Sequence, residues 1–303
     1  MPDATPLHIV SGKGGTGKTT IALAIALMLG RAGDKTLVCE VESRHGLSEA
    51  GGLPKIPDGQ ERTVAIAGQS LRMLSVDSGH ALRDYLASHA RLGVAGVILD
   101  KTGFVDFATE LAPGLRDVLL TGKVYQAARR RLKGSPHAVD AIVMDAPPTG
   151  RIETFLTAGD ALAEVMGVGP IAPQAQSIME LLRSPSTKVH LVTTLSEMAV
   201  TETLETIDAL TRHGIAIGHV VVNQVAGEPP ALPSAVTDGA LQSAWERDRA
   251  VAADQQPWAE TLAQRLTELD RPPALTIDLL PDEVGPDDLG HIADALAEGW
   301  AAA

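Results

Sequence analysis

The chain is poor in cysteine, in aromatic residues and in basic residues. Its one cysteine, Cys39, can form neither an internal disulfide nor a paired-thiolate metal site, which favours a reducing compartment. Aromatic residues make up 3% of the 303 residues. Lysine and arginine number 25 against 38 aspartate and glutamate residues, so the formal charge is −13. Such an acidic chain argues against a nucleic-acid partner held through its phosphate backbone.

Long hydrophobic runs are also missing. The longest, residues 21–29, has nine residues, whereas a helix that spans a membrane needs about 20. Residues 1–6 include an aspartate and no basic residue, so no signal peptide is expected there. With 45% hydrophobic and 21% charged residues, the chain can bury a sizeable core. We therefore expect a cytoplasmic, globular protein.

Short apolar runs alternate with helical patterns along most of the chain. Runs that are apolar on both faces, with helices between them, are typical of a mostly parallel sheet that is covered on both sides. The pattern therefore predicts an α/β, doubly wound fold. Strands are predicted at residues 7–10, 36–41, 139–145, 189–193, 216–223 and 274–280.

Three other stretches complete the predicted organisation. Residues 63–67 and 71–76 predict an edge hairpin joined by Gly68, Gln69 and Ser70. Residues 79–133 lack strand signals and predict a helical insertion, and residues 234–270 predict a second helical segment. We expect residues 1–303 to form a single domain that carries both.

A glycine-rich motif follows the first predicted strand. Residues 12–19 read GKGGTGKT and match G-x-x-x-x-G-K-[ST], and an apolar helix follows them. Glycines let backbone N–H groups turn toward phosphate oxygens, and the helix N-terminus adds positive potential. Lys18 is expected to reach the β- and γ-phosphates, and the Thr19 hydroxyl to bind Mg²⁺. The predicted phosphate-binding residues are Gly12, Gly14, Gly15, Thr16, Gly17, Lys18, Thr19 and Thr20.

Lys13, directly after the first glycine, distinguishes this P-loop from an ordinary one. A lysine at this place resembles the deviant Walker A loops. The resemblance implies that Lys13 reaches across a dimer interface to the phosphates bound by a partner subunit. The alternative is a solvent-exposed loop lysine.

Asp145 ends a buried apolar run and is followed by Ala-Pro-Pro-Thr-Gly. A carboxylate at the carboxyl end of a central strand is placed to organise the water shell of Mg²⁺, as a Walker B aspartate does. The alternative is that Asp145 caps the following helix.

Four segments beyond the P-loop resemble the family of the arsenite-pump ATPase ArsA and the ATPases that target tail-anchored proteins. ESRHGLSEA (42–50) and DAPPTGR (145–151) are similar to its switch I and switch II, and VVNQ (221–224) and LLPDEV (279–284) to its base-binding segments. The resemblance covers nearly the whole chain, including the strand-to-helix stretch with Glu197 and Glu202. It implies ATP and Mg²⁺ as cofactors, with catalytic roles for Lys13, Lys18, Glu42 and Asp145, and base contacts by Asn223, Gln224, Pro281 and Glu283.

Two departures from the family limit what the resemblance implies. Glu42 stands where the family places the aspartate that positions the attacking water. The carboxylate of a glutamate lies one methylene further from the backbone, and a misplacement of about 1 Å can lower the rate 10²-fold. The alternative is that Glu42 has no catalytic role and forms an ion pair with Arg44 or Arg151. Cys39 alone supplies neither the arsenite-binding thiolates nor a zinc clamp, and we expect it to be a small buried hydrophobe.

The expected function is an ATP-hydrolysing dimer switch that is coupled to a cargo or membrane partner. The dimer is either a homodimer or a heterodimer with a paralogue. Phe104, Phe107 and Leu111 in the insertion have helical spacing, and they form either its core or a groove for a hydrophobic or membrane-protein partner. Two alternatives stay open: a nucleotide-switched binding protein with little turnover beside an active paralogue, and a positioning ATPase of the MinD and ParA kind. The tail, residues 289–303, has no lysine or arginine, which argues against membrane docking.

Overall fold

The computed structural model describes residues 5–41, 45–89, 114–166, 171–233, 238–280 and 284–300. Its strands are β1 (Leu7–Gly12), β2 (Thr36–Val41), β3 (Glu61–Ile66), β4 (Gln69–Val76), β5 (Ala141–Asp145), β6 (Thr187–Thr193), β7 (Ile217–Val225) and β8 (Leu275–Asp278). They form one sheet in the order β3-β4-β2-β5-β1-β6-β7-β8. Every neighbouring pair is parallel except β3 with β4. The expected mostly parallel α/β sheet is confirmed.

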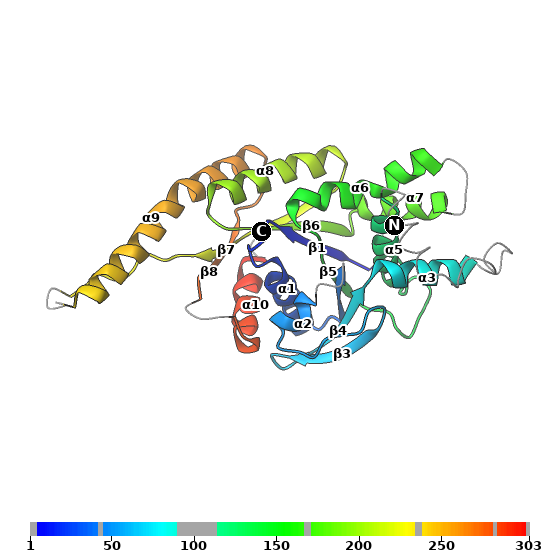
Figure 1. Ribbon diagram of the computed structural model, residues 1–303, viewed down its shortest axis with the longest axis horizontal. Helices are drawn as coiled ribbons and strands as arrows, with labels where there is room; N and C mark the ends of the chain where they lie inside the picture. Colours follow the sequence, from blue (N-terminus) through cyan, green and yellow to red (C-terminus); the bar gives the residue numbers. More distant parts are fainter. Residues whose placement is uncertain are drawn as a thin grey trace.

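Helices cover both faces of this sheet (Figure 1). The cluster of buried side chains on one face includes residues of α1, α2 and α10, and the cluster on the other includes residues of α5 to α9. The doubly wound arrangement follows from strands that are apolar on both faces. The helices are α1 (Lys18–Arg31), α2 (Gly46–Ala50), α3 (Ser78–His89), α5 (Leu115–Ala128), α6 (Thr149–Met166), α7 (Ile171–Leu182), α8 (Glu197–Arg212), α9 (Gly239–Glu268) and α10 (Pro286–Trp300).

The β3–β4 hairpin lies at one edge of the sheet, as predicted, but its turn differs from the prediction. Ile66 pairs with Gln69, so Ala67 and Gly68 alone form the turn, and a loop at residues 68–70 was the wrong expectation. Both turn residues have positive φ, 46° and 76°, which suits the right-handed twist of a hairpin. β3 is the outermost strand, and β4 joins the hairpin to β2.

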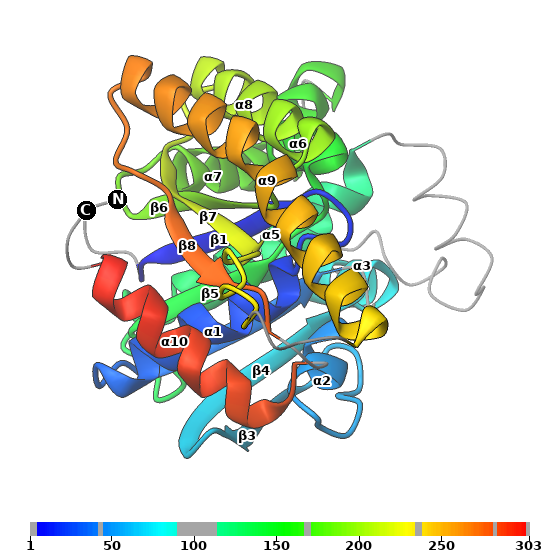
Figure 2. The ribbon, with the colours of Figure 1, turned by 90° about the vertical axis from the view of Figure 1, so that its left-hand side faces the viewer.

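The predicted helical stretches lie at opposite sides of the molecule (Figures 1 and 2). α3 and α5 lie at the two ends of residues 79–133, whereas Phe104, Phe107 and Leu111 lie outside the described residues. α9 occupies most of residues 234–270, and its N-terminal half extends away from the sheet, because its buried residues, Leu262 and Leu266, lie in the C-terminal half. No helix among the described residues is long and apolar enough to cross a membrane.

Three histidines stack across neighbouring strands, a feature that the sequence did not predict. His190 of β6 lies between His8 of β1 and His219 of β7, with ring centroids 5.3 Å and 5.6 Å apart, and Trp300 of α10 packs against all three rings. The backbone N–H of His219 donates to Nδ1 of His190 at 3.0 Å. His190 therefore carries its proton on Nε2, which lies 3.0 Å from Nδ1 of His8. The stack ties α10 to three central strands.

Candidate functional site

The glycine-rich loop leaves the sheet at the carboxyl end of β1 and closes at the first turn of α1. Gly15 and Gly17 have φ of 88° and 83°, a conformation that other residues rarely adopt. A Cβ at Gly12 would lie 2.2 Å from the carbonyl oxygen of Val192, so only glycine fits between the loop and β6. Since α1 begins at Lys18, its free N–H groups and its positive dipole end face the loop.

A hydroxyl and a carboxylate meet directly beneath this loop. The Thr19 hydroxyl donates to Oδ2 of Asp145 at 2.7 Å. Asp145 ends β5 in register with Val10 of β1, and 6% of its surface is exposed. Hard oxygen donors of this kind suit Mg²⁺, which is held by one or two protein groups together with phosphate oxygens. The donor set therefore fits the cation expected from the sequence, and Thr19 and Asp145 are the residues that would hold it.

A second buried carboxylate, which the sequence analysis did not single out, lies beside Asp145. Glu40 of β2 pairs in register with Asp145 of β5 and is 4% exposed. Its Oε1 accepts a hydrogen bond from the backbone N–H of Gly46, at the start of α2, at 2.6 Å. Burial raises the pKa of Glu40, and the nearby charge of Asp145 raises it further, whereas hydrogen bonds from Gly46 and Leu47 act in the opposite direction.

Lys13 lies against Glu202 of α8 in its own chain. Its Nζ is 2.7 Å from Oε2 of Glu202, and the Thr149 hydroxyl at the start of α6 donates to Oε1 at 2.6 Å. Partial burial raises the pKa of Glu202, but the hydrogen bonds from Lys13 and Thr149 outweigh it, and the pKa lies below its ordinary value. The contact joins the P-loop, the segment after Asp145 and α8.

A cavity of about 190 Å³ lies on the other side of the loop, next to the carboxyl end of β7. Asn223 donates from Nδ2 to the carbonyl oxygen of Thr16 at 2.9 Å, so the end of β7 is fixed to the P-loop. A Cβ at Gly17 would lie 2.3 Å from the same Nδ2. The cavity is lined by Gly17, Thr20, Asn223, Gln224, Ile277, Asp278, Leu279, Leu280, Val284 and Ile292.

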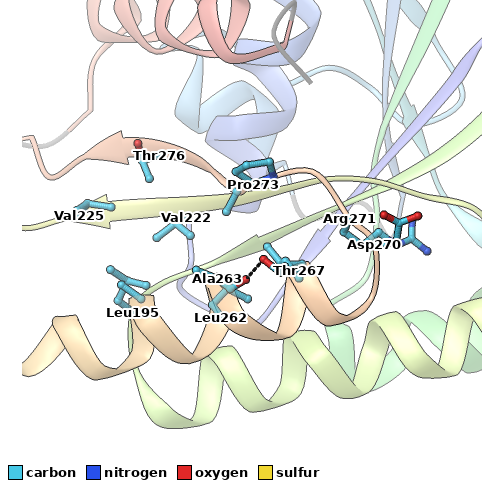
Figure 3. A pocket seen from close by; sticks show the side chains of 13 residues that line it. Leu195, Val222, Val225, Leu262, Ala263, Thr267, Asp270, Arg271, Pro273 and Thr276 are labelled. Atoms are coloured by element: carbon cyan, nitrogen blue, oxygen red, sulfur yellow. Dashed lines mark hydrogen bonds between the residues drawn. The ribbon is translucent and has the colours of Figure 1, made fainter.

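A larger cavity, of about 460 Å³, lies on the opposite face of β7 and β8 (Figure 3). Val222 of β7 and Leu262 of α9 face each other across it, and the Thr267 hydroxyl donates to the carbonyl oxygen of Ala263 within α9. Its lining is mostly aliphatic, and it is separated from the P-loop by the sheet. A nucleotide is therefore expected at the P-loop and the smaller cavity beside it, although the other cavity has the greater volume.

The structure brings most of the predicted site residues together. The P-loop residues, Asp145, Asn223 and Gln224 converge at the carboxyl ends of β1, β5 and β7. Glu42, Pro281 and Glu283 lie outside the described residues. Glu40 and Thr149 are the residues of this region that the sequence reasoning did not single out. A glutamate inside an apolar strand was the available signal for Glu40.

Known proteins that resemble this chain are named as ATPases. The anion-transporting ATPase family matches residues 6–183. ATPase BagA of Mycobacterium tuberculosis is 45% identical over 220 residues, which make up 72% of this chain and 64% of BagA. ATPase GET3 of Rhodotorula glutinis is 26% identical over 256 residues, 74% of this chain and 71% of that protein. A protein of Aquifex aeolicus named as an arsenical pump-driving ATPase is 22% identical over 254 residues, 72% of this chain and 80% of that protein. The matched region thus spans less than two thirds of the length of BagA.

Proposed function

Because this chain belongs to the anion-transporting ATPase family, we propose that it binds ATP with Mg²⁺ at the loop after β1 and hydrolyses the γ-phosphate. The hydrogen bond of 2.7 Å between the Thr19 hydroxyl and Asp145 carries this proposal. It supports the proposal because two oxygen donors that suit a cation lie next to the glycine-rich turn that would bind phosphate. Bound Mg²⁺ would neutralise negative charge that develops on the phosphates.

Residues around the loop would bind the phosphates and position the attacking water. Lys18 would bind the β- and γ-phosphates from the first turn of α1, together with the backbone N–H groups of the glycine-rich turn. Glu42 would position the attacking water. The role of Glu42 rests on the sequence resemblance alone.

The adenine base would lie in the cavity of about 190 Å³ beside Asn223 and Gln224. Asn223 already donates from Nδ2 to Thr16, so its Oδ1 is the atom that can accept from an exocyclic amine. Pro281 and Glu283 would close over the base.

We further propose that ATP brings two chains together, with Lys13 reaching the nucleotide of the partner. In the described chain Lys13 rests on Glu202, and this contact has to open before the lysine can serve another subunit. The partner is a second copy or a paralogue, and a hydrophobic or membrane-protein cargo would bind at the helical insertion. The names of BagA and the other relatives support the ATPase activity. The cargo is proposed from the sequence resemblance.

Steady-state ATP hydrolysis, measured together with molecular mass by light scattering, tests this function. We expect turnover and a shift from monomer to dimer with ATP and Mg²⁺, and loss of turnover in both Lys18→Ala and Lys13→Ala. The Lys13→Ala chain should still bind ATP, because Lys18 and the glycine-rich turn, which would hold the nucleotide of the same chain, are unchanged. Turnover by Lys13→Ala at the wild-type rate would exclude the role of this lysine in a partner's site.

A nucleotide-switched binding protein is the second candidate, because Glu42 replaces the family's aspartate. It predicts ATP binding without turnover above that of Lys18→Ala. In that case hydrolysis should appear when an active paralogue with aspartate at this position is added.

A further inference from the structure

Two acidic side chains share one face of the sheet at the place proposed for the cation. Glu40 and Asp145 are directly opposite each other on the neighbouring strands β2 and β5. Neighbouring strands lie about 4.8 Å apart, so the side chains of such a pair are neighbours that point to the same face. That face is the one covered by α1, because Val38 and Val143, two residues before each carboxylate, pack in the cluster of α1.

Glu40 also contacts the segment that follows β2. Its Oε1 accepts the N–H of Gly46 at 2.6 Å, and a Cβ at Gly46 would lie 3.4 Å from this oxygen and 3.6 Å from the Thr19 hydroxyl. Gly46 therefore lies between the second carboxylate and the hydroxyl proposed to bind Mg²⁺. The contact thus fixes the start of α2 beside the phosphate loop.

We propose that Glu40 is a positioning residue of the cation site, acting together with Thr19 and Asp145. Its carboxylate adds a second negative charge beside the cation and holds the start of α2 there. Binding of Mg²⁺ with nucleotide would thus be coupled to the position of Gly46 at the start of α2. This inference rests on the proposed function, because it needs a nucleotide and a cation at the loop.

The physical basis is the repulsion between two carboxylates in a site with little solvent. Like charges that lie close together in a poorly solvated place destabilise each other, and a divalent cation between or beside them relieves the repulsion. Groups outside the direct ligands of a metal commonly contribute about 10- to 100-fold to its affinity. Glu40 is placed to act in this way, because it neighbours Asp145 across the strands and is itself held by a backbone N–H.

A purely structural role for Glu40 makes a different prediction. If Glu40 only caps α2, an amide that keeps one carbonyl oxygen in the same place can still accept from Gly46. Any loss in Glu40→Gln would then come from packing, and it would weaken nucleotide binding equally with and without Mg²⁺. The charge model predicts changes of opposite sign, since removing a carboxylate near the phosphates favours the nucleotide without Mg²⁺ and disfavours it with Mg²⁺.

The experiment is a titration of the full chain with mant-labelled ATP, at increasing Mg²⁺ and in EDTA. For Glu40→Gln we expect the half-saturating Mg²⁺ concentration to rise about 10- to 100-fold, with binding in EDTA equal to or tighter than that of wild type. Glu49→Gln is the matched control, because Glu49 is an exposed glutamate on the same helix α2. It should leave both measurements unchanged, and Asp145→Asn should raise the Mg²⁺ requirement at least as much as Glu40→Gln.

Two outcomes would overturn the inference. An unchanged Mg²⁺ requirement in folded Glu40→Gln, with wild type dependent on Mg²⁺, would remove the role of Glu40 and leave the proposed ATP site intact. A wild-type chain that binds no mant-ATP would remove the proposed function and this inference with it. If Glu40→Gln does not fold, Glu40→Met replaces it, because methionine also removes the charge at a similar side-chain length, and an unchanged Mg²⁺ requirement in that variant overturns the inference in the same way.

Discussion

The histidine stack makes the stability of the fold depend on pH within a defined window. Burial, assisted by the charge of His219, lowers the pKa of His8 from 6.5 to about 4. Since the folded-state pKa lies below the unfolded value, the unfolded chain takes up the proton first as the pH falls. The stabilising contribution of neutral His8 is complete above pH 6.5 and is lost progressively as the pH falls toward 4.

The magnitude follows from the shift and from the hydrogen bond. One pKa unit corresponds to about 1.4 kcal/mol, so the shift of His8 is worth about 3 kcal/mol in total and about 2 kcal/mol between pH 7 and pH 5. The geometry explains the sign, because a proton on Nδ1 of His8 would face the proton that His190 carries on Nε2, 3.0 Å away. Burial and the charges of His8, His219 and Lys188 also lower the pKa of His190, so His190 does not offer the proton an alternative place.

Denaturant unfolding of wild type and His8→Gln at several pH values measures this effect. Glutamine does not titrate, so between pH 7 and pH 5 the wild type should lose about 2 kcal/mol more unfolding free energy than the variant. His291→Gln is the control, because His291 is exposed on α10, the helix that also carries Trp300. Its unfolding free energy should change with pH as that of the wild type does. A difference between wild type and His8→Gln that stays constant with pH would refute the assignment of a neutral, buried stack.

Three further predictions concern single positions. Gly17→Ala should weaken binding of mant-ATP at least tenfold, because φ is 83° and the added Cβ would lie 2.3 Å from Asn223; wild-type affinity would contradict the geometry of the loop. Phe155→Ala should lower the unfolding free energy by about 3–5 kcal/mol, against less than about 0.5 kcal/mol for the exposed Leu241→Ala, as measured in guanidinium; equal costs would contradict the difference in burial. Burial raises the pKa of the Cys39 thiol to about 12, so a thiol reagent should modify Cys39 only in the unfolded chain, and fast modification of the native protein would contradict this.

The sequence predicts the strands and the phosphate loop well, because their signals are local. The strand predicted at residues 36–41 is β2, and the loop at residues 12–19 lies between β1 and the first turn of α1 as expected. Apolar residues on both faces of a strand, glycines at positive φ and a lysine at the helix start each act over a few neighbouring residues. Such features need no knowledge of which strands are neighbours.

The features that the sequence did not predict depend on neighbouring strands far apart in the chain. The role proposed for Glu40 depends on Asp145, which lies 105 residues later in the chain. The two side chains are neighbours only because β2 pairs with β5. His8 and His190 likewise meet because β1 pairs with β6. The hairpin turn was misplaced for a local reason, since Ala67 occupies a left-handed position that normally favours glycine, asparagine or aspartate.

The resting place of Lys13 agrees energetically with a role in a partner's site. The side chains of Lys13 and Glu202 are 32% and 26% exposed, and ion pairs with such access to water contribute about 0–1 kcal/mol. Hydrogen bonds between a lysine and phosphate oxygens in a closed site are stronger, at about 1.5–3 kcal/mol each. Glu202 keeps the hydrogen bond from Thr149 when Lys13 leaves, so its carboxylate still has a hydrogen-bond donor after the contact opens. The proposed exchange of Lys13 from Glu202 to a partner's nucleotide would therefore favour a dimer only when that nucleotide is present, as the proposed ATP-dependent switch requires.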